Sequence, residues 1–86
     1  MQKLINTFAQ LDLSGVQMPI IVIYNSPKDY PGTYVARVWD MDKPTNIMML
    51  KKKLSTIRED IKAYLPNMVR LPKAQNDDPC IVETWI

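Results

Sequence analysis

Alternating and continuous apolar segments predict a sheet in the first half of the chain. Residues 18–24 read MPIIVIY and are apolar at both parities, which predicts a central strand covered on both faces. Residues 33–39 alternate between apolar and polar or small side chains, and residues 45–50 form a third apolar segment. Turn-forming residues separate the three segments. Residues 18–50 therefore predict a three-strand meander.

Helical periodicity appears in two other places. In residues 55–65 the apolar positions follow the i, i+4, i+7, i+8 spacing of a helix with one buried face: Ile57, Ile61, Tyr64 and Leu65. A similar but shorter stripe near the N-terminus predicts a short helix or arm within residues 1–12. Residues 68–71 and 80–86 read as two further strands.

The resulting order, (α)βββαββ, predicts an α+β fold. We expect an antiparallel sheet of four or five strands with one main helix packed on one face. A length of 86 residues fits a single domain, residues 1–86. A chain of this size buries only roughly 60–65% of its unfolded surface, so association is a common source of additional stability.

Composition excludes several classes of function. Histidine is absent, which rules out a Ser-His or Cys-His nucleophile within the chain. The single cysteine, Cys80, permits no intramolecular disulfide and is typical of a reducing cytoplasm. There is no run of 18 apolar residues, no cofactor motif and no evident small-molecule substrate site. We therefore expect a cytoplasmic, non-enzymatic protein without a cofactor.

Four carboxylates keep a metal-dependent hydrolase open as an alternative. Asp40 and Asp42 lie in one polar loop, and Asp77 and Asp78 lie in another. Together they could hold Mg²⁺ if the two loops met. Aspartates in polar loops beside proline more often form turns, so this alternative ranks below the others.

A repeated pattern of apolar, charged and tryptophan residues predicts a contact surface. Val35-x-Arg37-x-Trp39 and Ile81-x-Glu83-x-Trp85 each place these types on one strand face. If the two strands are neighbours, Arg37 and Glu83 would pair across the sheet under the tryptophans. Such a face is either a second core or a surface for a protein partner or for self-association. The candidate anchors are Tyr34, Arg37, Trp39, Glu83 and Trp85.

The middle of the chain is basic. Residues 43–73 carry eight Lys or Arg against two acidic residues, a formal +6, whereas residues 74–86 carry −3. Either these charges complement each other within the protein, or the basic segment binds nucleic acid or an acidic partner. The residues that would contact nucleic acid are Lys51, Lys52, Lys53, Arg58 and Lys62.

The order of elements resembles a known family. Residues 53–65 read KLSTIREDIKAYL and follow three predicted strands, with Ser55 to Asp60 in the place of a helix-opening phrase. This arrangement, from Pro19 to Val69, is similar to the HicB-like antitoxin domain and, in overall phrasing, to small proteins of bacterial mobile elements. The resemblance implies a degraded ribonuclease-H-like fold and a bacterial regulatory role exerted through protein contacts. The sequence thus favours a homodimeric interaction module, with nucleic-acid binding as the main alternative.

Overall fold

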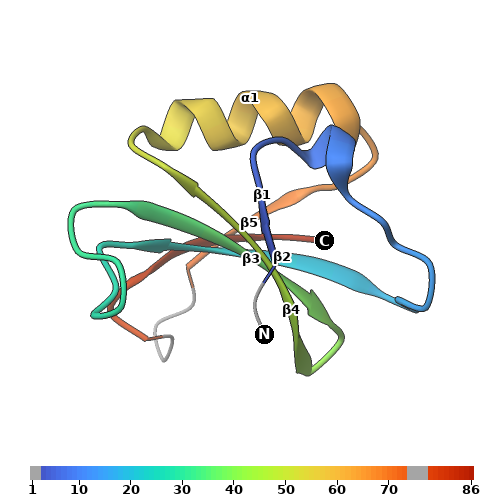
Figure 1. Cartoon of the computed structure of the whole chain (residues 1–86), viewed down its shortest axis with the longest axis horizontal. Helices are drawn as coiled ribbons and strands as arrows, with labels where there is room; N and C mark the ends of the chain where they lie inside the picture. The colour runs from blue at the N-terminus through green and yellow to red at the C-terminus, as the bar shows by residue number, and fades with distance from the viewer. Residues whose placement is uncertain (1–2, 74–77) are drawn as a thin grey trace.

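Strands β2 and β3 form the centre of a six-stranded mixed sheet in the computed structural model, which describes residues 3–73 and 78–86. The strand order is β1-β4-β3-β2-β6-β5, and one α-helix lies across one face of the sheet (Figure 1). The elements are β1 (Lys3–Ile5), η1 (Phe8–Gln10), β2 (Pro19–Asn25), β3 (Tyr34–Asp40), β4 (Lys43–Lys51), α1 (Leu54–Tyr64), β5 (Arg70–Pro72) and β6 (Ile81–Trp85). The fold is α+β.

The predicted sheet is wrong in two details. It has six strands in place of four or five, and it is mixed, because β1 pairs in parallel with β4 while the other pairings are antiparallel. The meander β2-β3-β4 follows the pattern that the apolar alternation predicts. The added strand comes from the N-terminal segment, where the sequence predicts a helix or arm.

The apolar residues of that segment pack without forming an α-helix. Ile5 aligns with Met49 of β4, so the open edge of the sheet supplies the backbone partners. The following 3₁₀ turn is fixed by Asp60 of α1, whose carboxylate accepts from Thr7 Oγ1 at 2.7 Å and from Phe8 N at 2.5 Å. A helix this short is only marginally stable without tertiary contacts, so the segment pairs with the sheet edge as a strand instead.

The core lies between the sheet and α1. Ile57 and Ile61 of α1 are fully buried against the face of the sheet that carries Ile21, Ile23 and Met49. These positions alternate along their strands, so the intervening side chains point to the opposite face. No helix of the described residues is long and apolar enough to cross a membrane.

The β3–β4 turn contains a conformational strain that can be tested. Met41 has a φ of 56°, a left-handed conformation that most side chains disfavour, and its side chain is 55% exposed. Met41→Gly keeps the backbone N–H that bonds to Met18 O and removes the strain. We expect the free energy of unfolding to rise by about 1 kcal/mol. That corresponds to a rise in Tm of roughly 4–8 °C.

Differential scanning calorimetry measures this change. Asp42→Gly is the control, since Asp42 is not among the residues with positive φ. Glycine there relieves no strain and only raises the conformational entropy of the unfolded chain. Equal effects of the two substitutions would contradict the assignment of strain to Met41.

Candidate functional site: the uncovered face of the sheet

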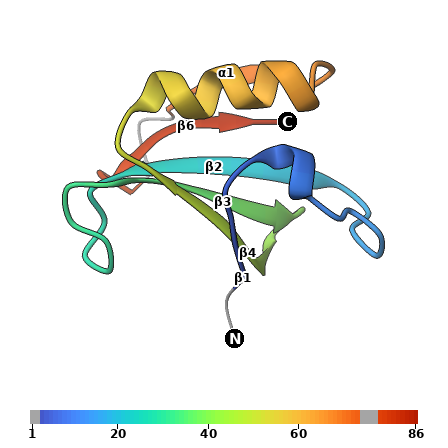
Figure 2. The same cartoon turned by 45° about the horizontal axis from the view of Figure 1, so that its top comes forward.

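The face of the sheet away from α1 carries a row of side chains that crosses all six strands. The register aligns these residues, from one edge to the other, as Leu4, Met48, Arg37, Val22, Thr84 and Leu71. The two edge residues are exposed, Leu4 at 58% and Leu71 at 40%. Arg37 therefore lies near the middle of a mainly apolar row. Figure 2 shows that no helix covers this side of the sheet.

Trp39 extends this surface along β3. It lies two residues beyond Arg37 and aligns with Ile20 of β2, so both tryptophan and arginine point away from the helix. Val35 completes the same face of β3 and is 3% exposed, although it belongs outside the main core cluster. We call this side of the sheet the uncovered face. It consists of the row that runs across the strands from Leu4 to Leu71, together with Val35 and Trp39.

The loop between β2 and β3 folds over one end of the uncovered face. It bends to the side away from α1 in both views (Figures 1 and 2). Two hydrogen bonds fix its shape, from Ser26 N to Thr33 O at 2.9 Å and from Gly32 N to Ser26 Oγ at 2.8 Å. The loop lines one side of an open hollow of about 430 Å³, and residues of the sheet together with Asp78 and Cys80 line the rest. This volume is in the range of sites that receive a small molecule or a group of partner side chains.

The chemistry of this hollow is mixed. Val35 and Met48 are its most buried lining residues, at 3% and 4% exposure, while Arg37 and the rings of Tyr24 and Tyr30 also line it. Exposed charges of both signs complete the lining: Lys28, Asp29 and Asp78. An apolar base with balanced charges above it suits a protein contact better than a single-sign ligand.

Two N–H donors of this face lack a hydrogen-bond acceptor within the described part of the chain. They are Arg37 Nε and Trp39 Nε1, both buried below the surface. A buried donor without an acceptor costs about 1–3 kcal/mol.

The structure corrects the predicted pairing of Arg37 with Glu83. Strands β3 and β6 are not neighbours, because β2 lies between them. Glu83 and Trp85 align with Ile23 and Ile21 on the helix side, opposite to Arg37 and Trp39. The five predicted anchors therefore divide between the two faces. Tyr34 also lies on the helix side, where it is partly buried against the core.

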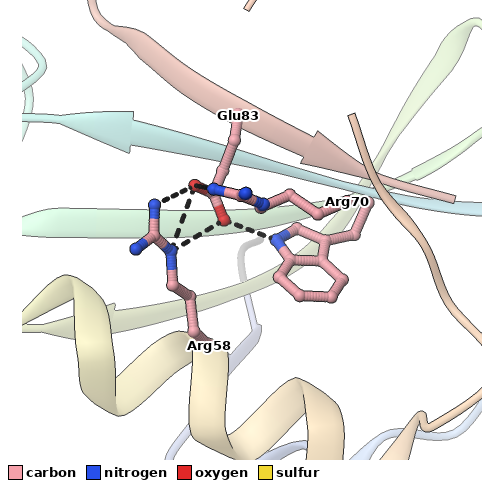
Figure 3. Close-up of polar contacts among 4 residues, drawn as sticks. Arg58, Arg70 and Glu83 are labelled. Carbon is pink, nitrogen blue, oxygen red and sulfur yellow. Dashed lines mark hydrogen bonds and ion pairs between the residues drawn. The ribbon is translucent and has the colours of Figure 1, made fainter. Parts of the chain in front are cut away.

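Glu83 forms a buried ion pair under α1 (Figure 3). Its side chain is 3% exposed, and Arg58 Nε donates to both carboxylate oxygens at 3.2 Å, while Arg58 Nη2 donates to Oε1 at 2.5 Å. Trp85 Nε1 donates to Oε2 at 2.7 Å, and Arg70 Nη1 lies 3.8 Å from Oε1. Burial alone raises the pKa of Glu83, but these hydrogen bonds and positive charges outweigh burial and hold the pKa below its usual value.

The predicted basic surface is divided into two places. Lys51 and Lys52 line a shallow hollow beside Thr33 and Leu50, and Lys53 is exposed as the residue before α1. Arg58 and Lys62 instead line a separate hollow with Arg70 and Trp85. The structure does not bring the five predicted residues into one site.

The predicted metal site is not supported in the part that the structure describes. No group of three acidic, cysteine or histidine side chains suited to a metal ion occurs among residues 3–73 and 78–86. Asp78 Oδ1 accepts from Cys80 N at 2.8 Å, which is a turn-forming role, whereas Asp40 Oδ1 accepts from Met18 N at 3.0 Å and joins the end of β3 to the residue before β2. Asp77 lies outside the described residues.

The sequence patterns do not identify several residues of these sites. Val22 and Met48 belong to the uncovered face only because the register places them beside Arg37. Arg70 reaches Glu83 because β5 and β6 pair Arg70 with Trp85. The alternation along β5 predicts which face of that strand carries Arg70, but nothing in the sequence predicts that β5 pairs with β6.

The chain matches no family model, no curated protein and no solved structure. The HicB-like resemblance accordingly rests on the order of elements and on the residues that open α1.

Proposed function

We propose that this protein is a non-enzymatic interaction module that pairs with a second copy of itself through the uncovered face. The observation that carries the proposal is the row of side chains centred on Arg37, on the side of the sheet that no helix covers. Arginine and tryptophan are enriched among the residues that dominate binding energy at protein interfaces. Arg37 and Trp39 are the anchors in this proposal.

The dimensions of the protein support a contact that uses the whole face. The molecule measures 30 × 26 × 25 Å, so a face of 30 × 25 Å projects to about 750 Å². A stable interface buries about 800 Å² on each partner. Two such faces would stack as packed sheets do, about 10 Å apart, with their inward side chains interdigitated.

The charges around the hollow suit self-association. Lys28 and Arg37 supply two positive charges, and Asp29 and Asp78 supply two negative charges. In a two-fold contact the same patch meets itself, so a balanced patch pairs with its copy without net repulsion. A patch of one sign would instead favour an oppositely charged partner.

Sedimentation velocity over a range of concentrations tests the proposal. We expect a dimer that dissociates on dilution, and Trp39→Ala should weaken the dimer by about 2 kcal/mol, or roughly thirtyfold in Kd. The matched control is Tyr64→Ala, which removes a 51% exposed aromatic from the helix side and should leave the Kd unchanged. A monomer at every concentration would overturn self-association and leave a different protein, as in an antitoxin-like role, as the occupant of this face.

Arg37→Met is a second test of the proposal, with opposite effects expected on the stability of the domain and on dimerisation. It removes the unpartnered Nε while keeping the aliphatic stem, so the isolated domain should be as stable as the wild type or more stable by about 1 kcal/mol. Dimerisation should nevertheless weaken. Loss of association together with loss of stability would mean that Arg37 acts in folding and not in binding.

A further inference from the structure

A small basic hollow lies on the other side of the sheet, beside α1. It is lined by Arg58, Lys62, Arg70 and Trp85 and has a volume of about 200 Å³. Arg58 comes from the helix, whereas Arg70 lies on the β5 side of the buried carboxylate (Figure 3). Sites for whole small molecules usually occupy about 300–1,000 Å³. This hollow has the size for one charged group of a ligand.

The charges of the hollow are unbalanced. Three cations face one carboxylate, that of Glu83, so the formal sum is +2. Both oxygens of Glu83 already accept hydrogen bonds, from Arg58 and from Trp85. Lys62 has no ion-pair partner among the residues that the structure describes. The excess positive charge is therefore available to an anion from outside.

Glu83 also positions the main donor of the hollow. It holds the Arg58 guanidinium through Nε and Nη2, and the Arg58 side chain is still 36% exposed. Arg70 is 56% exposed, and its Nη1 lies 3.8 Å from Glu83 Oε1, beyond hydrogen-bond distance, so it can turn toward an added anion at little cost. A guanidinium that is already oriented loses less entropy when it binds an oxyanion.

We propose that this hollow binds a phosphate group. Guanidinium groups match the tetrahedral oxyanion with paired N–H donors, and Lys62 adds a point charge from one helical turn beyond Arg58. The group comes either from a free phosphorylated small molecule or from a nucleic-acid backbone, since both present the same oxyanion. The site is separate from the uncovered face, so it is independent of the proposed dimer.

Nuclear magnetic resonance of the two tryptophan indole N–H groups tests the proposal. Trp85 Nε1–H bonds to Glu83 within the site, whereas Trp39 lies on the opposite face and serves as an internal reference. The probes are inorganic phosphate, adenosine monophosphate and a ten-nucleotide oligothymidylate, each against sodium chloride at equal ionic strength. We expect a saturable shift of the Trp85 resonance with each phosphate probe and none with chloride.

Lys62→Gln and Arg70→Gln test the two exposed cations. Each should weaken phosphate binding roughly tenfold or more, because each removes a charge-assisted hydrogen bond. Lys43→Gln is the matched control, an exposed cation at the far end of the β3–β4 hairpin. Circular dichroism confirms that the variants fold.

The outcomes separate the possible sources. Much tighter binding of the oligonucleotide, with a salt dependence that becomes shallower in Arg70→Gln, identifies a nucleic-acid backbone. Equal binding per phosphate group identifies a small phosphorylated ligand. Equal shifts with phosphate and chloride, or unchanged binding in both variants, overturns the proposal.

Discussion

Replacing Arg58 by methionine is expected to lower the free energy of unfolding by about 2–3 kcal/mol at pH 7. The substitution keeps most of the aliphatic volume but leaves the Glu83 carboxylate, 3% exposed, without its main partner. Removing one partner of a buried ion pair usually costs about 3–5 kcal/mol. The expected loss is smaller here because Arg58 is itself 36% exposed and Trp85 still donates to Glu83.

The pH dependence of this loss distinguishes its cause. In the wild type the pKa of Glu83 is below its ordinary value, so the ion pair contributes fully above the unfolded pKa of about 4.3. That contribution is lost as the pH falls through the folded pKa. In Arg58→Met, burial dominates and raises the pKa of Glu83, so protonation relieves the variant. The difference in stability between the two proteins should therefore shrink as the pH falls from 7 toward 4.

Urea denaturation at several pH values measures this difference. Lys62→Met is the matched control, since it removes an exposed cation of the same helix that has no ion pair in the described chain. The double variant Arg58→Met/Glu83→Gln should recover much of the lost stability, because no buried charge remains and the amide oxygen still accepts from Trp85 Nε1. A loss that is independent of pH and persists in the double variant would point to packing by the Arg58 stem instead.

Local patterns predicted the meander and the main helix because both obey a short-range rule. The alternation of 33–39 and the i, i+4 spacing of Ile57 and Ile61 decide which side chains share a face within one element. The prediction was wrong for the N-terminal segment. Its apolar spacing fits a helix, but it forms strand β1 because the edge of β4 supplies backbone hydrogen-bond partners. Tertiary pairing overrode a weak local preference.

The candidate site shows where such rules stop. The apolar-charged-tryptophan pattern correctly placed Arg37 and Trp39 on one face of their strand and Glu83 and Trp85 on one face of another. It could not tell that the two faces are opposite, because this depends on the register of β3 and β6 on β2, in which Arg37 aligns with Val22 and Glu83 aligns with Ile23. The register also shifts between Ile23 and Tyr24, a local irregularity that no composition signal marks.

Ile61→Ala is expected to lower the free energy of unfolding by about 3 kcal/mol. Ile61 is fully buried between α1 and the sheet, and truncating such a residue costs about 2–5 kcal/mol through lost burial and the cavity that remains. A domain of 86 residues has a total stability of roughly 4–13 kcal/mol. The substitution therefore removes a large share of it. Tyr64, which the apolar spacing predicted on the buried face, is instead 51% exposed at the end of α1, so Tyr64→Ala should change stability by less than about 1 kcal/mol.

The same variant separates folding from association. Ile61 lies under α1 and Trp39 lies on the uncovered face, so their effects should add within about 0.5 kcal/mol in the double variant. Below its unfolding transition, Ile61→Ala should keep the dimer dissociation constant of the wild type, because the proposed contact surface is on the other side of the sheet. The melting temperatures of the wild type and of Ile61→Ala should also rise with protein concentration by the same amount, as mass action requires for a dimer. If Ile61→Ala weakened the dimer as strongly as Trp39→Ala, the contact would have to lie on the helix side and the proposed face would be wrong.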